Sequence, residues 1–144
     1  MRSFLDRGSD IDERDSIRRT ALAVASKHGK LQVAKLLIER GADVSSRSRT
    51  GWTPLHYASN GGHLDIVQLL LDHNADLYAR QKSQRTALDF ASREGHLAVA
   101  EHLLERGANA NLRNSSGRTP KQEALMRGYP KIAELLTRYG AHDW

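Results

Sequence analysis

Residues 53–77 read TPLHYASNGGHLDIVQLLLDHNADL, and this stretch decides the fold. Thr53 and Pro54 are typical of a helix N-cap and of the first helical position. Gly62 predicts the end of that short helix in a left-handed conformation, and apolar residues at helical spacing then predict a second helix. Asn74, which tolerates positive φ, predicts where the second helix ends. The stretch therefore predicts two short helices and a turn.

The same pattern recurs every 33 residues along the chain. Equivalent glycines keep the same phase as the helix starts, and no insertion or deletion interrupts them. A single unit cannot bury its apolar stripe alone, so the units are expected to stack into a solenoid. The capping threonines of the four units are Thr20, Thr53, Thr86 and Thr119.

The 33-residue period and the TPLH-x-A motif at residues 53–58 resemble the ankyrin-repeat family over practically the whole chain. The resemblance implies an all-α solenoid of helix-turn-helix units with β-hairpin loops, and partner contacts on the concave face that the loops and first helices form. It implies a protein-interaction module. It does not identify the partner, because the fold alone does not specify function. We expect a single domain over residues 1–144. Its predicted parts are a partial repeat or N-terminal cap at 1–14 and repeats at 15–47, 48–80, 81–113 and 114–144.

Both ends of the array depart from the repeat. Residues 4–11 align with residues 37–44, so the chain is expected to begin inside an earlier repeat, either as a fragment of a longer array or as a shortened cap. Lys121 and Thr137 replace apolar residues of the other units. Because terminal repeats need a polar outer face, we expect repeat 4 to be a C-terminal cap that ends the array near Trp144.

Three other positions depart from the pattern. Arg18 and Gln84 stand where the loops that contain Gly51 and Gly117 have glycine, so altered turns are expected there. His102 replaces leucine on a second helix, where we expect it to be partly exposed.

Composition excludes several classes of protein. The chain has 144 residues, no cysteine and a formal charge of +5, with 16 arginines but only six lysines. A disulfide framework and a cysteine nucleophile are therefore excluded. No apolar run approaches the roughly 20 residues of a membrane span, and the N-terminal residues do not resemble a signal peptide. We expect an intracellular monomer, either cytoplasmic or nuclear.

Catalytic motifs are missing from the sequence. His63 and His96 share one column of the repeat, and their spacing reflects the period rather than a metal site. The ankyrin resemblance implies that His56 holds the loop by hydrogen bonds. The sequence has no HExxH, P-loop or GxSxG motif. It therefore predicts no enzymatic activity, no catalytic residue, no metal site and no cofactor.

Basic residues concentrate in three columns of the predicted loops, six, four and one residue before each capping threonine. These twelve positions hold nine basic residues, one tryptophan, two serines and no acid. Arginine suits planar, multidentate recognition of anions. A recurring arginine could instead pack its stem on the next loop without any ligand. The candidate partner-binding residues are Arg14, Arg47, Arg80, Arg113, Arg49, Lys82, Arg19, Trp52, Arg85 and Arg118.

Trp52 interrupts the cationic row in the middle of the array. A large exposed aromatic residue ringed by cations is typical of an interface anchor. Tyr57 and Phe90 lie on the predicted first helices, where they could lie beneath Trp52 as secondary candidates or pack between repeats.

Three hypotheses follow for function. The first is a protein-interaction module that binds an acidic or phosphorylated segment of another protein through this basic face. The second is recognition of a nucleic acid or another polyanion, with Trp52 stacking on a base. The third is an architectural role within a larger multidomain protein.

Overall fold

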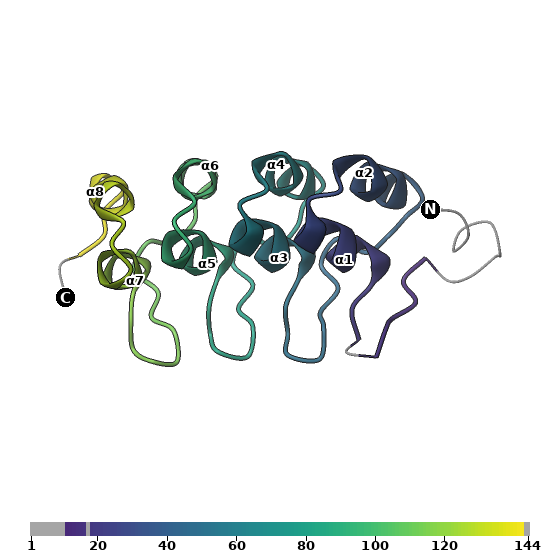
Figure 1. Cartoon of the computed structure of the whole chain (residues 1–144), viewed down its shortest axis with the longest axis horizontal. Coiled ribbons are helices and arrows are strands. Elements are labelled where there is room, and N and C mark those ends of the chain that lie inside the picture. The colour runs from purple at the N-terminus through teal and green to yellow at the C-terminus, as the bar shows by residue number, and fades with distance from the viewer. Residues whose placement is uncertain (1–10, 17, 143–144) are drawn as a thin grey trace.

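The computed structural model describes residues 11–16 and 18–142. In this part of the chain eight helices form four consecutive pairs, and no strand is present. Figure 1 shows the first helices of the pairs in one row, the second helices in a parallel row, and long loops that project from the row of first helices. The helices are α1 (Ala21–His28), α2 (Leu31–Glu39), α3 (Pro54–Gly61), α4 (Leu64–Asp72), α5 (Ala87–Arg93), α6 (Leu97–Glu105), α7 (Pro120–Met126) and α8 (Pro130–Arg138).

The predicted N-caps are confirmed in all four units. Each threonine side chain accepts a hydrogen bond from the backbone N–H three residues later, as Thr86 does from Asp89. In α3 and α7 the side chains of His56 and Gln122 also accept from the backbone N–H of the capping threonine. Each cap stabilises its helix by about 1 kcal/mol, which matters for helices of only seven or eight residues.

Packing between neighbouring repeats buries the core. α1 packs on α3, α3 on α5, and α5 on α7, while each first helix also packs on its own second helix. The apolar columns meet at these interfaces, so Leu22, Leu55 and Leu88 are at most 1% exposed. The solenoid architecture is confirmed. No described helix is both long and apolar enough to cross a membrane.

The four loops that precede the first helices are called here loop 1 (12–19), loop 2 (45–52), loop 3 (78–85) and loop 4 (111–118). They fold back on themselves in the manner of hairpins (Figure 1), although the expected β-strands are not present among the described residues. Adjacent loops are joined by backbone hydrogen bonds, from Lys82 N to Thr50 O at 2.9 Å and from Ser115 N to Ser83 O at 2.9 Å. The loops therefore form one continuous edge.

The prediction of altered turns at Arg18 and Gln84 is wrong. Their φ angles of 64° and 61° place both residues in the left-handed region, where Gly51 and Gly117 lie at 85° and 77°. All four loops close with the same pair of backbone hydrogen bonds. Hydrogen bonding within and between loops therefore imposes the turn even where the side chain disfavours it. A non-glycine residue in this conformation costs roughly 1–2 kcal/mol.

The ends of the array are only partly described. Residues 1–10 of the predicted partial repeat lie outside the described residues, as does Trp144. In repeat 4, Lys121 is half-buried, and the exposed Thr137 donates its hydroxyl to Ala133 O at 3.0 Å. His102 on α6 is half-buried, which agrees with its predicted position on a second helix.

Candidate functional site

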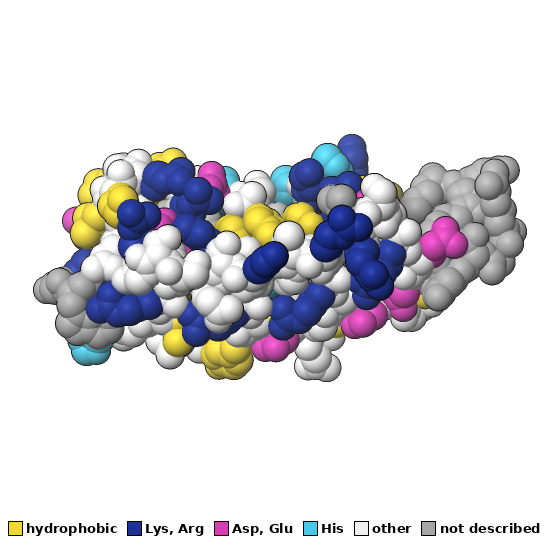
Figure 2. Space-filling view, turned by 90° about the horizontal axis from the view of Figure 1, so that it is seen from below, with side chains coloured by type: hydrophobic (Ala, Val, Ile, Leu, Met, Phe, Trp, Pro, Cys, Tyr) yellow, Lys and Arg dark blue, Asp and Glu magenta, His cyan; other side chains and the backbone are white. Residues whose placement is uncertain are grey.

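The predicted basic face lies along the edge of the four loops. Figure 2 shows this edge from below, with Lys and Arg side chains spread along the length of the molecule. The candidate residues of one column occupy equivalent places in successive loops, because the described residues of each loop form the same pair of closing backbone hydrogen bonds. The side chains of the three columns, however, have different surroundings.

The column six residues before the capping threonine clamps the loops together. Arg14 Nη1 donates to Arg18 O at 2.9 Å within its own loop and also to Arg47 O in the next loop. Arg47 Nη1 repeats the pattern, donating to Gly51 O at 3.2 Å and to Arg80 O at 2.9 Å. Each guanidinium therefore closes its own loop and joins it to the following one.

The same clamp continues to the last loop. Arg80 donates through Nε to Gln84 O at 3.1 Å and through Nη2 to Arg113 O. Arg113 Nη1 donates to Gly117 O at 2.7 Å. The structural interpretation of this column, that each arginine packs on the next loop, therefore agrees with the observed contacts.

The hydrogen bonds of this clamp leave some guanidinium N–H donors of the row available to a ligand. The hydrogen bonds of Arg14 and Arg47 use Nη1, and no described residue accepts from their Nε or Nη2 atoms. Those two atoms form the side-on fork that fits a carboxylate or phosphate. No carboxylate among the described residues forms an ion pair with Arg14, Arg47 or Arg80. The row is thus uncompensated along loops 1–3.

The loop tips add two further cations. Arg49 is exposed and donates through Nη2 to Ser16 O at 3.1 Å. Lys82 is exposed, and its ammonium group has no partner among the described residues. Both belong to loops 2 and 3, which flank the middle of the array.

The column immediately before the threonine is neutralised instead. Arg19 pairs with Asp15 in loop 1, with 2.9 Å between Nε and Oδ2. Arg85 lies 3.2 Å from Asp89 through Nε and 3.4 Å from Glu123 through Nη2. The absence of acids from the loop columns therefore does not make these arginines free.

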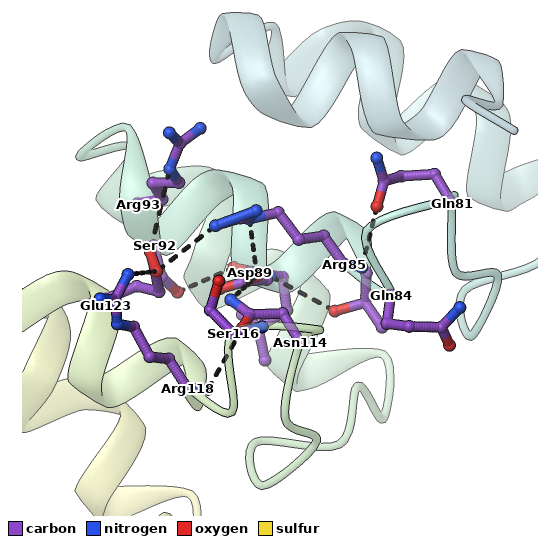
Figure 3. Close-up of polar contacts among 12 residues, drawn as sticks. Gln81, Gln84, Arg85, Asp89, Ser92, Arg93, Asn114, Ser116, Arg118 and Glu123 are labelled. Carbon is purple, nitrogen blue, oxygen red and sulfur yellow. Dashed lines mark hydrogen bonds and ion pairs between the residues drawn. The ribbon is translucent and has the colours of Figure 1, made fainter. Parts of the chain in front are cut away.

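Glu123 is the centre of a buried ionic cluster, which Figure 3 shows. Besides Arg85, it lies 3.8 Å from Arg93 and 3.7 Å from Arg118. Its own side chain and that of Asp89 are only 3% exposed. Two carboxylates thus balance most of the charge of three guanidiniums.

Asp89, on α5, is the second buried carboxylate of this cluster. Asn114 Nδ2 in loop 4 donates to its Oδ2 at 3.1 Å, which links α5 to the next repeat. Burial raises the pKa of Asp89 to about 6, against the opposing effects of the Asn114 hydrogen bond and the Arg85 charge. This cluster was not predicted from the sequence, although one signal was present. Asp89 and Glu123 replace His56 and Phe90 in columns that lie on the first helices.

An aromatic cluster lies at the middle of the array. Trp52 is half-buried, with its ring centroid 4.9 Å from that of Tyr57 and 4.4 Å from that of Phe90. Phe90 is 2% exposed. It packs between repeats, the second of the two expected placements, and cannot contact a partner in this conformation, so Phe90 is not a secondary contact residue. Tyr57 is half-buried and, with Trp52, forms the accessible part of the cluster.

His56 supports this cluster from below. Its Nε2 lies 2.9 Å from Ala79 O in loop 3, and its Nδ1 accepts from Thr53 N. Burial lowers the pKa of His56 to about 4, so the ring is neutral at pH 7. The ring can then donate through Nε2 and accept through Nδ1. The implied role of His56 in holding the loop agrees with these contacts.

A family model described as ankyrin repeats (3 copies) matches residues 1–81, 47–114 and 78–143. These overlapping ranges extend over nearly the whole chain. No curated protein matches the chain.

Proposed function

Because the chain belongs to the ankyrin-repeat family, we propose that it is a non-catalytic protein-interaction module whose basic loop edge binds an acidic segment of its partner. Ankyrin repeats indicate protein-protein interaction modules in general. The observation that carries the finer proposal is the row of Arg14, Arg47 and Arg80 without carboxylate partners among the described residues, together with the half-buried Trp52 in loop 2. A cytoplasmic or nuclear location belongs to the same proposal and rests on the cysteine-free composition.

The proposed contact region is smaller than the predicted set of ten residues. Arg19, Arg85 and Arg118 already face carboxylates at 2.9–3.7 Å. An incoming anion would have to compete with those carboxylates. The row of Arg14, Arg47 and Arg80 runs along loops 1–3, but loop 1 also holds three acids, whereas loops 2 and 3 hold none. We therefore place the acidic part of the partner along loops 1–3 and centre it on loops 2 and 3.

The spacing of the repeats defines the pattern that a partner should carry. Packed helices lie roughly 8–10 Å apart, and an extended chain advances about 3.3 Å per residue. An acid at about every third residue of an extended segment therefore meets successive guanidiniums. The free side-on forks of Arg14 and Arg47 accommodate carboxylates, and a phosphate would bind to the same atoms.

Trp52 supports a protein partner over a nucleic acid. Its ring already stacks against Tyr57 and Phe90, at 4.9 Å and 4.4 Å between centroids. Less of the ring face is then left for a base, and stacking sites for single strands usually repeat such aromatics. An architectural role in a larger protein is compatible with the same fold and makes no use of the uncompensated row.

The test uses a labelled twelve-residue peptide made of four Glu-Gly-Ser units, with a Lys-Gly-Ser peptide as its charge-reversed counterpart. Lys82→Glu and Arg49→Glu reverse the charge of the loop tips without removing the clamp. Lys35→Glu and Arg40→Glu make the same change at exposed positions outside the loops, at α2 and the residue that follows it. We expect fluorescence anisotropy to show at least about tenfold weaker binding of the acidic peptide to the loop-tip variant only, a difference of about 1.4 kcal/mol. Equal binding by both variants would contradict the proposed site.

A further inference from the structure

We propose that the edge where the inner face meets the C-terminal end of the solenoid is a second contact site, which takes a large apolar side chain flanked by acidic residues. The site is a shallow groove beside α7. Its lining residues are Gly117, Arg118, Gln122, Leu125 and Met126. The proposal deepens the proposed function and rests on it, because it assigns the groove to the same acidic class of partner.

Two apolar side chains are exposed at this edge. Leu125 is 55% exposed and Met126 is 62% exposed, although both side chains are large and apolar. In earlier repeats the column of Leu125 holds serines that are fully buried: Ser26, Ser59 and Ser92. Repeat 4 thus presents leucine where the others have a small polar residue. Two neighbouring exposed apolar side chains beside a groove make this edge a candidate interaction site.

A further repeat stacked in register is a poor occupant for this end. Lys121 stands in the column of Leu22, Leu55 and Leu88, which are at most 1% exposed. Thr137 stands in the column of Leu71 and Leu104, which are 5% and 4% exposed. Stacking would therefore bury the ammonium group of Lys121, in a column that holds leucine in every earlier repeat, and also the hydroxyl of Thr137. Burying such groups without compensation is costly.

Continuity and charge favour a partner segment instead. Arg118 lines the groove and belongs to loop 4, so the groove continues the basic edge. The side chain of Arg118 is 44% exposed, and its single ion-pair contact with a described residue, from Nη1 to the buried Glu123, is long at 3.7 Å, so an acidic residue in the groove competes with a weak contact only. Arg127, exposed, directly follows Met126. Figure 2 shows hydrophobic side chains beside Lys and Arg side chains at this end of the molecule.

Methionine suits the role of the groove wall. Its unbranched, polarisable side chain adapts to partner side chains of different shape. The lining contains one cation and no acid, so a segment with acidic residues around its apolar side chain is favoured over a basic one. Together these features predict an apolar anchor at one end of the partner segment, separate from the acidic contacts of loops 1–3.

Met126 itself provides the readout. The chain contains two methionines, so methyl-¹³C methionine labelling gives two NMR signals, and a Met126→Leu variant identifies the one from the groove. Three seven-residue peptides serve as probes: a central Leu flanked by Glu on both sides, the same peptide with central Ser, and the central Leu flanked by Lys. Leu125→Ser is the matched surface variant, and thermal unfolding checks that it remains folded.

We expect the Glu-flanked Leu peptide to shift the Met126 methyl signal at about tenfold lower concentration than the other two, with the effect lost in Leu125→Ser. Equal shifts from the Lys-flanked peptide, or no shift from any peptide, would overturn the inference. A Met126 signal that changes on dilution of the protein alone would show a second copy in the groove and would also overturn it. The proposed function fails separately, when the loop-tip variant binds the Glu-Gly-Ser peptide as well as the unchanged protein does.

Discussion

Arg47 donates a hydrogen bond from Nη1 to the carbonyl oxygen of Arg80, the equivalent residue of the next repeat, at 2.9 Å. Because Arg14 and Arg80 do the same one repeat earlier and later, each loop is fixed to its neighbour by a charged side chain. The row therefore has two roles. It orders the loop edge, and it keeps an uncompensated positive charge along that edge.

The first prediction concerns the stability that this clamp provides. Arg47→Ala removes the hydrogen bonds to Gly51 O and Arg80 O. We expect the free energy of unfolding to fall by about 1 kcal/mol, because hydrogen bonds from exposed charged donors are individually modest. Urea unfolding measures the change, and Arg40→Ala, at an exposed residue after α2, is the control. Equal stability of both variants would show that the clamp contributes nothing.

The second prediction concerns the strained turns. Gln84→Gly relieves a side chain held at φ 61°. Glycine also gains freedom in the unfolded chain, so the net gain is smaller than the strain, about 0.5–1 kcal/mol. The reverse change, Gly117→Ala, meets no atom within 4 Å, so its cost is that of the backbone alone. Thermal unfolding should therefore move in opposite directions for the two variants, and a lower melting temperature for Gln84→Gly would refute the strain.

The third prediction follows from the opposed pKa shifts of His56 and Asp89. Burial lowers the pKa of His56 from 6.5 to about 4, so its contribution to stability is complete above pH 6.5 and is lost as the pH falls through 4. Burial raises the pKa of Asp89 from 3.8 to about 6, so its contribution is complete below pH 3.8 and is lost as the pH rises through 6. Between about pH 4 and 6 the two slopes have opposite signs and largely cancel.

A variant that lacks one of the two titrating groups should show the pH dependence of unfolding free energy that the other group causes. Asp89→Asn should lose stability on acidification from pH 7 to 4 more steeply than the unchanged protein, by about 1 kcal/mol or more over that interval. His56→Gln should instead gain stability over the same interval. Urea unfolding at several pH values gives the slopes, and parallel curves for all three proteins would rule out this balance.

The fourth prediction concerns the buried ionic cluster. Glu123→Gln keeps the shape of a side chain that is 3% exposed but removes the charge shared by three guanidiniums at 3.4–3.8 Å. We expect a loss of about 2 kcal/mol, because charged groups that lose a buried partner are costly. Compared with the unchanged protein, hydrogen exchange in Glu123→Gln should become faster in α7 and change little in α3. Glu134→Gln, exposed on α8, is the control and should change the stability by less than about 0.5 kcal/mol.

The fold could be read from the sequence because it depends on columns. The capping Thr53, the left-handed Asn74 and the buried Leu55 each repeat a local requirement at a fixed spacing. The altered turns were predicted wrongly because hydrogen bonds that the residue type alone does not indicate hold Gln84 in the left-handed region. Gln84 N donates to Gln81 O within loop 3, and Lys82 N donates to Thr50 O of loop 2.

The candidate site was less predictable because the effect of an arginine depends on which groups lie around its guanidinium in the folded chain. Arg47 and Arg85 are the same residue type in neighbouring columns, yet one donates to carbonyl groups and the other pairs with Asp89 and Glu123. Those acids come from first helices of this repeat and the next, up to 38 residues away from Arg85. Counting charges within the loops could not find them.

The last prediction separates a protein partner from a nucleic acid by salt. Tryptophan occurs twice in the chain, so a Trp144→Phe variant leaves Trp52 as the single indole reporter beside Tyr57. If about five phosphates were bound with a base on Trp52, the logarithm of the binding constant should fall against the logarithm of salt concentration with a slope near −3.5 to −4.5. Since the Trp52 ring already stacks on two rings, we expect a single-stranded oligonucleotide to quench its fluorescence little and to show a slope no steeper than about −1. A steep slope with strong quenching would replace the acidic protein segment by a nucleic acid as the ligand of this face.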